Sequence, residues 1–166
     1  MRSLVTGSNG LIGSYMPEKL LSLGDEVCLI SRKPKKLNLR FTGNFKMNYG
    51  DISDLNFIRL CIKDFKPERI FHFAAQSLPT LSWLEASNTL RVNIEGTYNL
   101  LSAVCDLCPE SLVIMTGSSA EYGQSKNGMK IKEDHFLEPN TIYGISKLAN
   151  YHLTKLLFKT KKLRVI

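Results

Sequence analysis

The sequence lacks the long apolar run that a membrane-spanning helix requires. No stretch of its 166 residues approaches the ~18 consecutive apolar residues of such a helix. A glycine-rich segment follows Val5 and interrupts the first apolar stretch, so there is no apolar core of a secretory signal. These absences predict a cytoplasmic protein that has no membrane partner.

Cysteine is scarce, and its spacing does not favour a metal or redox site. The four cysteines are Cys28, Cys61, Cys105 and Cys108, of which the last two form a lone C-x-x-C. A zinc site needs a second such pair or nearby histidines. A thioredoxin-like site places the motif at a helix start, whereas this pair ends a helical pattern. We expect incidental, reduced thiols and no metal.

The net charge is +7, yet the basic residues are dispersed, which argues against a nucleic-acid partner. The second of two denser groups follows a predicted helix, and we interpret it as a solvated surface. The groups are Arg32, Lys33, Lys35, Lys36 and Arg40, then Lys159, Lys161, Lys162 and Arg164.

Short apolar runs alternate with longer amphipathic ones, which predicts β-α-β units around a parallel sheet. The expected strands cover 2–6, 26–31, 45–49, 69–74 and 112–117, with a sixth starting near 163. The expected helices cover 11–23, a segment that 51–54 opens and that runs to about 65 with Ser53 or Asp54 as N-cap, then 82–107 and 141–160. The predicted fold class is α/β, a Rossmann-type, doubly wound, three-layer α/β/α domain over 1–166. Because the chain stops inside an expected strand, we expect a truncated chain whose C-terminal substrate domain is absent.

A glycine loop joins the first expected strand to the first expected helix. In this loop Gly7 allows a tight turn, Gly10 lets a pyrophosphate approach the backbone, and Gly13 allows close packing of helix on strand. A glycine-rich structural turn is the alternative. The predicted dinucleotide-binding segment is Gly7, Ser8, Asn9, Gly10, Leu11, Ile12 and Gly13.

The end of the second strand indicates which dinucleotide binds. An enzyme that uses NAD usually carries Asp or Glu there, to bind the ribose 2′-hydroxyl. This sequence has Ser31 followed by Arg32, and a guanidinium can pair with a 2′-phosphate. The pattern therefore favours NADP(H) over NAD(H), although Lys35 and Lys36 can belong to a merely solvated basic loop.

Tyr143 and Lys147 stand four residues apart in a predicted helix, so they share one face. An ammonium beside a phenol stabilises the phenolate, which lets the pair act as acid or base at a sugar hydroxyl or carbonyl. Taken alone, this spacing is common on helix surfaces. Ser118 follows the fifth strand and could bond the same substrate oxygen, or Ser118 and Ser119 could simply cap the loop.

Two further segments fall where a cofactor would lie. The small residues of Phe73-Ala74-Ala75-Gln76-Ser77 follow the fourth strand and allow close approach to its backbone. Asn93 lies inside a predicted helix, where its propensity is unfavourable, and we interpret it as a structural or relay residue.

These motifs, in this order, resemble the extended short-chain dehydrogenase/reductases known as NAD-dependent epimerase/dehydratases. Within that family the chain is most similar to the branch of GDP-mannose 4,6-dehydratase and GDP-4-keto-6-deoxy-mannose reductase. The features shared with that branch are Ser31-Arg32, Tyr49-Gly50-Asp51, Ala74-Ala75-Gln76-Ser77, Ser82-Trp83 and Gly117-Ser118-Ser119.

The resemblance implies roles by position. Tyr143 would be the acid/base, Lys147 its activator and ribose ligand, and Ser118 the hydroxyl partner. The pair Asp51-Ile52 would contact adenine, and Ser77, Ser119 and Ala120 would contact substrate. The family acts on nucleotide-linked sugars, and its long helices commonly pair in a homodimer.

One departure concerns the reaction. Dehydratases of this family carry a Glu two positions after Ser118, where this sequence has Ala120, with Glu121 one place late. The residues therefore favour an NADP(H)-dependent reductase or epimerase that acts at the sugar C4. The alternatives are a GDP-mannose 4,6-dehydratase-like lyase and, from another class, a non-catalytic NADP(H)-binding sensor.

Overall fold

The computed structural model describes residues 1–34, 43–124 and 130–166, so Lys35, Lys36 and Arg40 lie outside the described residues. Six strands form one parallel sheet in the order β3-β2-β1-β4-β5-β6. They are β1 (Arg2–Thr6), β2 (Glu26–Ser31), β3 (Phe45–Tyr49), β4 (Arg69–His72), β5 (Leu112–Met115) and β6 (Arg164–Val165). This order confirms the predicted Rossmann-type architecture.

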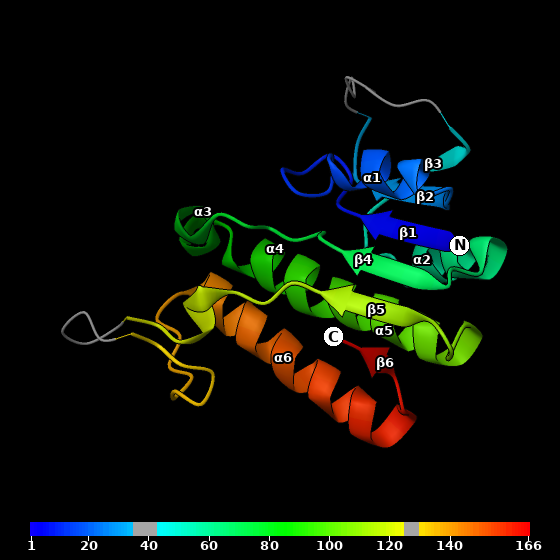
Figure 1. The fold of residues 1–166 in the computed structure, drawn as a ribbon. Coiled ribbons are helices and arrows are strands. Elements are labelled where there is room, and N and C mark those ends of the chain that lie inside the picture. The colour runs from blue at the N-terminus through cyan, green and yellow to red at the C-terminus, as the bar shows by residue number, and fades with distance from the viewer. Residues whose placement is uncertain (35–42, 125–129) are drawn as a thin grey trace.

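Helices cover both faces of the sheet, but unequally. On one face α1 (Met16–Ser22) packs on β1 and β2, and Leu20 lies in a small apolar cluster there. On the other face α2 (Leu55–Phe65), α5 (Gly96–Leu107) and α6 (Ile142–Lys161) lie side by side over the larger core (Figure 1). No helix among the described residues is long and apolar enough to cross a membrane.

The single helix predicted over 82–107 is wrong, because the structure divides that segment. It begins as α3 (Pro79–Leu84) and α4 (Ala86–Leu90), passes through the π-helical turn η1 (Arg91–Glu95), and continues as α5. In η1 the backbone N–H of Gly96 donates to the carbonyl of Arg91, five residues earlier. π-helical turns are rare and are frequently found at functional sites, and Asn93 lies at the centre of this one.

Residues close by in the sequence determine where α1 and α2 begin. The first helix begins at Met16 rather than at residue 11, with turns over 11–15 and Pro17 in its first turn. By contrast, α2 begins as predicted, since Asp54 caps it by accepting a hydrogen bond from the Phe57 N–H at 3.1 Å.

Candidate active site

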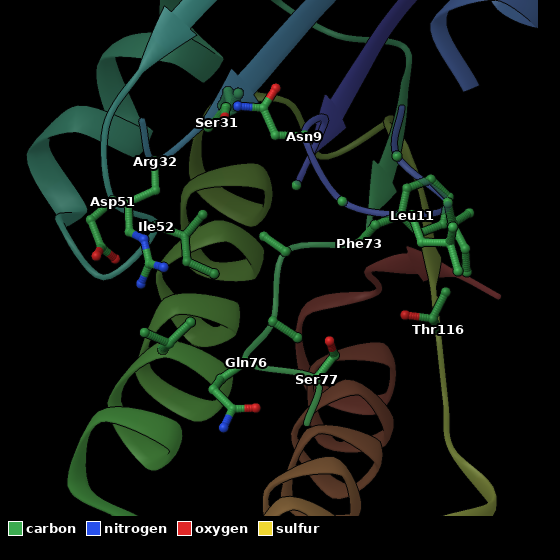
Figure 2. Close-up of a pocket in the computed structure, with 18 of the residues that line it drawn as sticks. Asn9, Leu11, Ser31, Arg32, Asp51, Ile52, Phe73, Gln76, Ser77 and Thr116 are labelled. Carbon is green, nitrogen blue, oxygen red and sulfur yellow. The ribbon is translucent and has the colours of Figure 1, made fainter. Parts of the chain in front are cut away.

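A cleft of about 850 Å³ lies beyond the carboxyl ends of the strands and is lined by loops after β1, β2, β3, β4 and β5 and by α6. Figure 2 shows labelled side chains from these segments around it. Most predicted site residues line this cleft: Gly7, Asn9, Gly10, Leu11, Ile12, Gly13, Arg32, Asp51, Ile52, Phe73, Ala74, Ala75, Gln76, Ser77, Tyr143 and Lys147. Ser8, Asn93, Ser118, Ser119 and Ala120 are not among its lining residues.

The glycine loop is shaped so that side chains cannot replace its hydrogens. Gly7 has φ +70°, and a Cβ added at Gly13 would lie 2.2 Å from the Gly7 carbonyl oxygen. The backbone N–H groups of Leu11 and Ile12 have no acceptor within the described part of the chain, and both residues line the cleft. An exposed backbone with free N–H donors suits a pyrophosphate, so the residues present fit a dinucleotide.

The loop after β2 is fixed to the glycine loop by its backbone. The carbonyl of Lys33 accepts from the Asn9 side-chain amide at 2.8 Å and from the Ser31 hydroxyl at 3.2 Å. These bonds place Arg32 at the cleft, and Figure 2 shows its side chain extending towards Asp51 and Ile52. Arg32 is thus placed by hydrogen bonds to the backbone of the next residue, while its own side chain is exposed.

Asp51 is held in its ionised form. Partial burial acts to raise the pKa of this carboxyl, but hydrogen bonds from Ser53 and the charges of Arg91 and Arg32 outweigh burial and lower it. The Oδ1 atom of Asp51 accepts from the Ser53 N–H at 2.9 Å and from its hydroxyl at 2.7 Å. A fixed carboxylate is therefore available at the end of the cleft nearest Arg32.

Asn93 does not line the cleft but holds one of its walls. The Oδ1 atom of Asn93 accepts from the Gln76 N–H at 2.8 Å, and its Nδ2 donates to the Gln76 carbonyl at 3.1 Å. The same Nδ2 donates to the Ser146 hydroxyl on α6 at 2.9 Å. The amide therefore fixes the loop after β4 relative to the helix that carries Tyr143 and Lys147.

The start of α6 sets the place of Tyr143. The Thr141 hydroxyl caps the helix by accepting from the Gly144 N–H at 2.9 Å. The Tyr143 N–H donates instead to the hydroxyl of Ser82 on α3, at 3.2 Å. Ser82 is fully buried, so a second element locks the first turn of this helix.

Lys147 lies one turn further along α6, and its ammonium points to the end of β5. Its Nζ donates to the Thr116 carbonyl at 2.6 Å, and the residue is 6% exposed. Burial lowers the pKa of Lys147, and the negative charge of Glu121 acts in the opposite direction. The cleft therefore has a buried cation beside the phenol-bearing turn.

Ser118 is engaged in capping in this structure. Its hydroxyl accepts from the Ala120 N–H at 3.2 Å, and its own N–H donates to the buried Glu121 carboxylate at 2.8 Å. This reciprocal capping box begins η2 (Ser119–Glu121), a short 3₁₀ helix. Of the three predicted catalytic residues, the structure brings Tyr143 and Lys147 to the cleft and places Ser118 next to Gly117, which lines it.

Sequence reasoning missed three buried polar residues that hold the site: His72, Ser82 and Glu121. His72 carried a signal, since it is a titratable residue inside an otherwise apolar strand. Glu121 carried one too, since Ser118 and Glu121 have the Ser-x-x-Glu spacing of a capping box. The role of Ser82 had no such signal, because its hydroxyl accepts from the Tyr143 N–H, 61 residues away.

The four thiols are held in their protonated form by burial. Burial raises the pKa of Cys28 to about 12 and that of Cys61 to about 11. Burial also raises the pKa values of Cys105 and Cys108. Over residues 1–34, 43–124 and 130–166, no group of three or more His, Cys, Asp or Glu side chains could hold a metal ion.

Solved structures with this fold define the class as a Rossmann-type domain of nucleotide-sugar epimerases and dehydratases. UDP-glucose 4-epimerase of Thermus thermophilus, in complex with NAD, matches with a TM-score of 0.90 at 28% identity, over 99% of this chain and 53% of that one. A dTDP-glucose 4,6-dehydratase of Streptomyces venezuelae, with NAD bound, matches with a TM-score of 0.88 at 28% identity, over 99% and 54%.

The chain belongs to the GDP-mannose 4,6-dehydratase family, whose sequence model matches residues 4–166. Human GDP-mannose 4,6-dehydratase is 32% identical over 163 residues, which are 90% of this chain and 44% of the human protein. CDP-paratose 2-epimerase of Salmonella typhi is 32% identical over 129 residues, 74% of this chain and 38% of that protein. The chain therefore spans less than half the length of these curated relatives.

Proposed function

We propose that the cleft binds a nicotinamide dinucleotide, with the pyrophosphate over the glycine loop and the adenosine between Arg32 and Asp51. The observation that carries this proposal is the glycine loop, in which Leu11 and Ile12 line the cleft and their backbone N–H groups have no acceptor within the described part of the chain. The solved relatives above contain NAD. For this chain we propose a preference for NADP(H), because Arg32 stands where NAD enzymes usually carry a carboxylate.

The proposed reaction takes place at C4 of a nucleotide-linked sugar, and a bound nicotinamide would supply or accept the hydride. In this proposal Tyr143 gives or takes the proton of the C4 oxygen. Lys147, whose ammonium is buried and held at the Thr116 carbonyl, stabilises the phenolate electrostatically. The first turn of α6, locked by Thr141 and Ser82, keeps the phenol at a fixed place above the cleft.

Among reactions at C4, we propose reduction or epimerisation. A dehydratase needs a second carboxylate base, and the position that supplies it in the family is Ala120 here. Glu121 does not replace it, since its carboxylate is buried and accepts the Ser118 N–H. Dehydration of GDP-mannose is the second candidate, because the matching family model is that of GDP-mannose 4,6-dehydratase.

A product assay separates these candidates. Purified protein is incubated with NADPH and a GDP-4-keto-6-deoxy-hexose, and separately with NADP⁺ and GDP-mannose. Loss of the reduced-nicotinamide absorbance in the first mixture supports reduction. Formation of a 4-keto-6-deoxy product in the second supports the dehydratase, and formation of the C4 epimer there, with no net change in the nicotinamide, supports epimerisation. Binding of the cofactor with none of these products would overturn all three.

The role of Tyr143 is tested by Tyr143→Phe, which removes only the phenolic oxygen. Turnover should fall by about 10²- to 10⁴-fold, the usual contribution of a positioned acid or base. Tyr151→Phe is the matched control, since Tyr151 lies on the same helix and is exposed. Full turnover by Tyr143→Phe would exclude the proposed chemistry.

We further propose a cytoplasmic homodimer formed through α5 and α6. The support is a set of exposed large apolar or aromatic side chains on these adjacent helices: Tyr98, Tyr151, Leu156 and Phe158. Analytical ultracentrifugation should give twice the chain mass, and Phe158→Glu should shift the protein to monomer.

A further inference from the structure

A buried histidine that the proposed chemistry does not use lies at the junction of the two halves of the site. His72 ends β4, is 4% exposed, and is paired in the sheet with Thr6, the last residue of β1. Its Nδ1 lies 2.7 Å from the Thr6 hydroxyl, and its Nε2 lies 3.0 Å from the Thr97 hydroxyl on α5. Both ring nitrogens are therefore satisfied by hydroxyls from neighbouring elements.

Each of these two hydroxyls also accepts a hydrogen bond from a residue close to the cleft. The Thr6 hydroxyl accepts from the Ala74 N–H at 3.2 Å, and Thr6 directly precedes the glycine loop. The Thr97 hydroxyl accepts from the Asn150 side-chain amide at 3.3 Å, and Asn150 lies on α6 about one turn after Lys147. The imidazole thus joins two loops that line the cleft to the helix that carries Tyr143 and Lys147.

Each ring nitrogen faces a hydroxyl that also accepts a second hydrogen bond, from the Ala74 N–H at Thr6 and from the Asn150 amide at Thr97. A hydroxyl has one hydrogen and two lone pairs, so each can donate to the ring or accept from it. A neutral imidazole, which carries one hydrogen, therefore satisfies both contacts with its hydrogen on either nitrogen. Burial lowers the pKa of His72 to about 3, with a further contribution from the charge of Lys147, so the ring stays neutral at neutral pH.

We propose that His72 is a positioning residue, which sets the distance between the cofactor-side loops and helix α6 through the Thr6 and Thr97 hydroxyls. The inference rests on the proposed binding of a nicotinamide dinucleotide to the same cleft. Removing the Thr6 hydroxyl leaves the Ala74 N–H and the Nδ1 atom without partners, and Ala74 lines the cleft. Removing the Thr97 hydroxyl releases the ring from α5 and α6 without touching the cleft.

The first experiment reads the imidazole directly. Nitrogen-15 NMR of the purified protein should show one histidine in a single neutral tautomer whose shifts stay constant between pH 5 and 8, while His135 and His152 are exposed. That signal should disappear in His72→Gln and should move in Thr97→Val. A His72 signal that titrates in this range, or that ignores Thr97→Val, would overturn the network whether or not a dinucleotide binds.

The second experiment measures the affinity for NADP⁺ by calorimetry. Thr6→Val should weaken binding about tenfold, because a lining N–H loses its acceptor, and Thr6→Ser, which keeps the hydroxyl, should restore it. The matched control is Ser111→Ala, a buried hydroxyl that donates to the Pro67 carbonyl at the opposite edge of the sheet. It should lower stability and leave NADP⁺ affinity unchanged.

The two proposals fail in different ways. A wild-type protein that binds neither NADP⁺ nor NAD⁺ would overturn the proposed function. Binding by the wild type that Thr6→Val and Ser111→Ala weaken equally, or that Thr6→Val leaves unchanged, would overturn the positioning role of His72 alone.

Discussion

The two ends of the strands in the parallel sheet, which we call its amino edge and its carboxyl edge, treat their polar groups in opposite ways. At the amino ends of the strands, Asp25 is buried and paired with the Ser3 hydroxyl at 2.6 Å and the Arg69 guanidinium at 2.5 Å. Burial acts to raise the pKa of Asp25, but hydrogen bonds from Ser3, Arg69 and the terminal ammonium outweigh it and lower the pKa. At the carboxyl ends, Leu11 and Ile12 of the glycine loop line the cleft, and their backbone N–H groups have no acceptor among the residues that the structure describes.

The difference separates stability from binding. A polar group that is fully paired inside the protein stabilises the fold and has nothing left to offer a ligand, whereas unpaired donors on a rigid backbone can bind an anion. The proposed positioning residue His72 belongs to the paired kind although it lies at the carboxyl edge. The comparison therefore predicts that substitutions at the two edges have separable effects.

The largest expected effect comes from Gly13→Ala at the carboxyl edge. The new Cβ would lie 2.2 Å from the Gly7 carbonyl oxygen, so the glycine loop must move and NADP⁺ binding should be lost. Gly24→Ala is the control, because Gly24 also has a positive φ (+79°) but has open space around it, with no atom within 4 Å. It should cost about 1–2 kcal/mol of stability from backbone strain, with unchanged NADP⁺ affinity by calorimetry.

Asp25→Ala should do the reverse at the amino edge. Removing one partner of a buried ion pair costs about 3–5 kcal/mol of unfolding free energy, measurable by urea denaturation, while NADP⁺ affinity stays constant. Asp106→Ala breaks an exposed pair with Arg59 and should cost less than about 1 kcal/mol. A variant at Asp25 that binds NADP⁺ much more weakly without unfolding would remove the separation between the edges.

The stability of the protein should depend on pH through His72. Its pKa is about 3 in the folded protein against 6.5 ordinarily, so between these values the unfolded chain binds a proton that the folded chain does not. Its contribution is complete above pH 6.5, and the unfolding free energy should fall by about 1.4 kcal/mol per pH unit below it. Urea titrations at pH 7, 6 and 5 should show this slope in wild type and in His152→Gln, but not in His72→Gln.

Arg32→Gln should have a smaller effect, confined to the choice of cofactor. Affinity for NADPH should fall about tenfold, as expected when a charged hydrogen bond to a phosphate is lost, while affinity for NADH should not fall. Arg59→Gln, on α2, is the matched control. Equal losses for both cofactors would show that Arg32 does not read the 2′-phosphate.

The sequence predicted those features of the fold and site that depend on residues close together in the chain, and it missed those that depend on contacts between residues far apart in it. The strands of the sheet centre were predictable because they are short apolar runs, and the glycine loop because its spacing is local. The division of 82–107 was not, since Asn93 turns inward for two distant partners, the Gln76 backbone and Ser146. The capping by Ser118 was foreseen only as an alternative, and the roles of Ser82 and His72 depend on pairings that only the folded chain creates.

The π-helical turn before α5 has a consequence for reading patterns along this chain. Its wider hydrogen-bonded loop accommodates one residue more than an α-helical turn. The wide turn absorbs that residue, so a helical wheel that counts 100° per residue through it is out of phase by about 100° on the far side. Deletion of a single residue there should let the turn close to an α-helical one, while Thr97 and Asn99 keep their partners in β4 and before α2. An alignment that closes a one-residue gap at this turn would therefore misassign the face of every downstream residue.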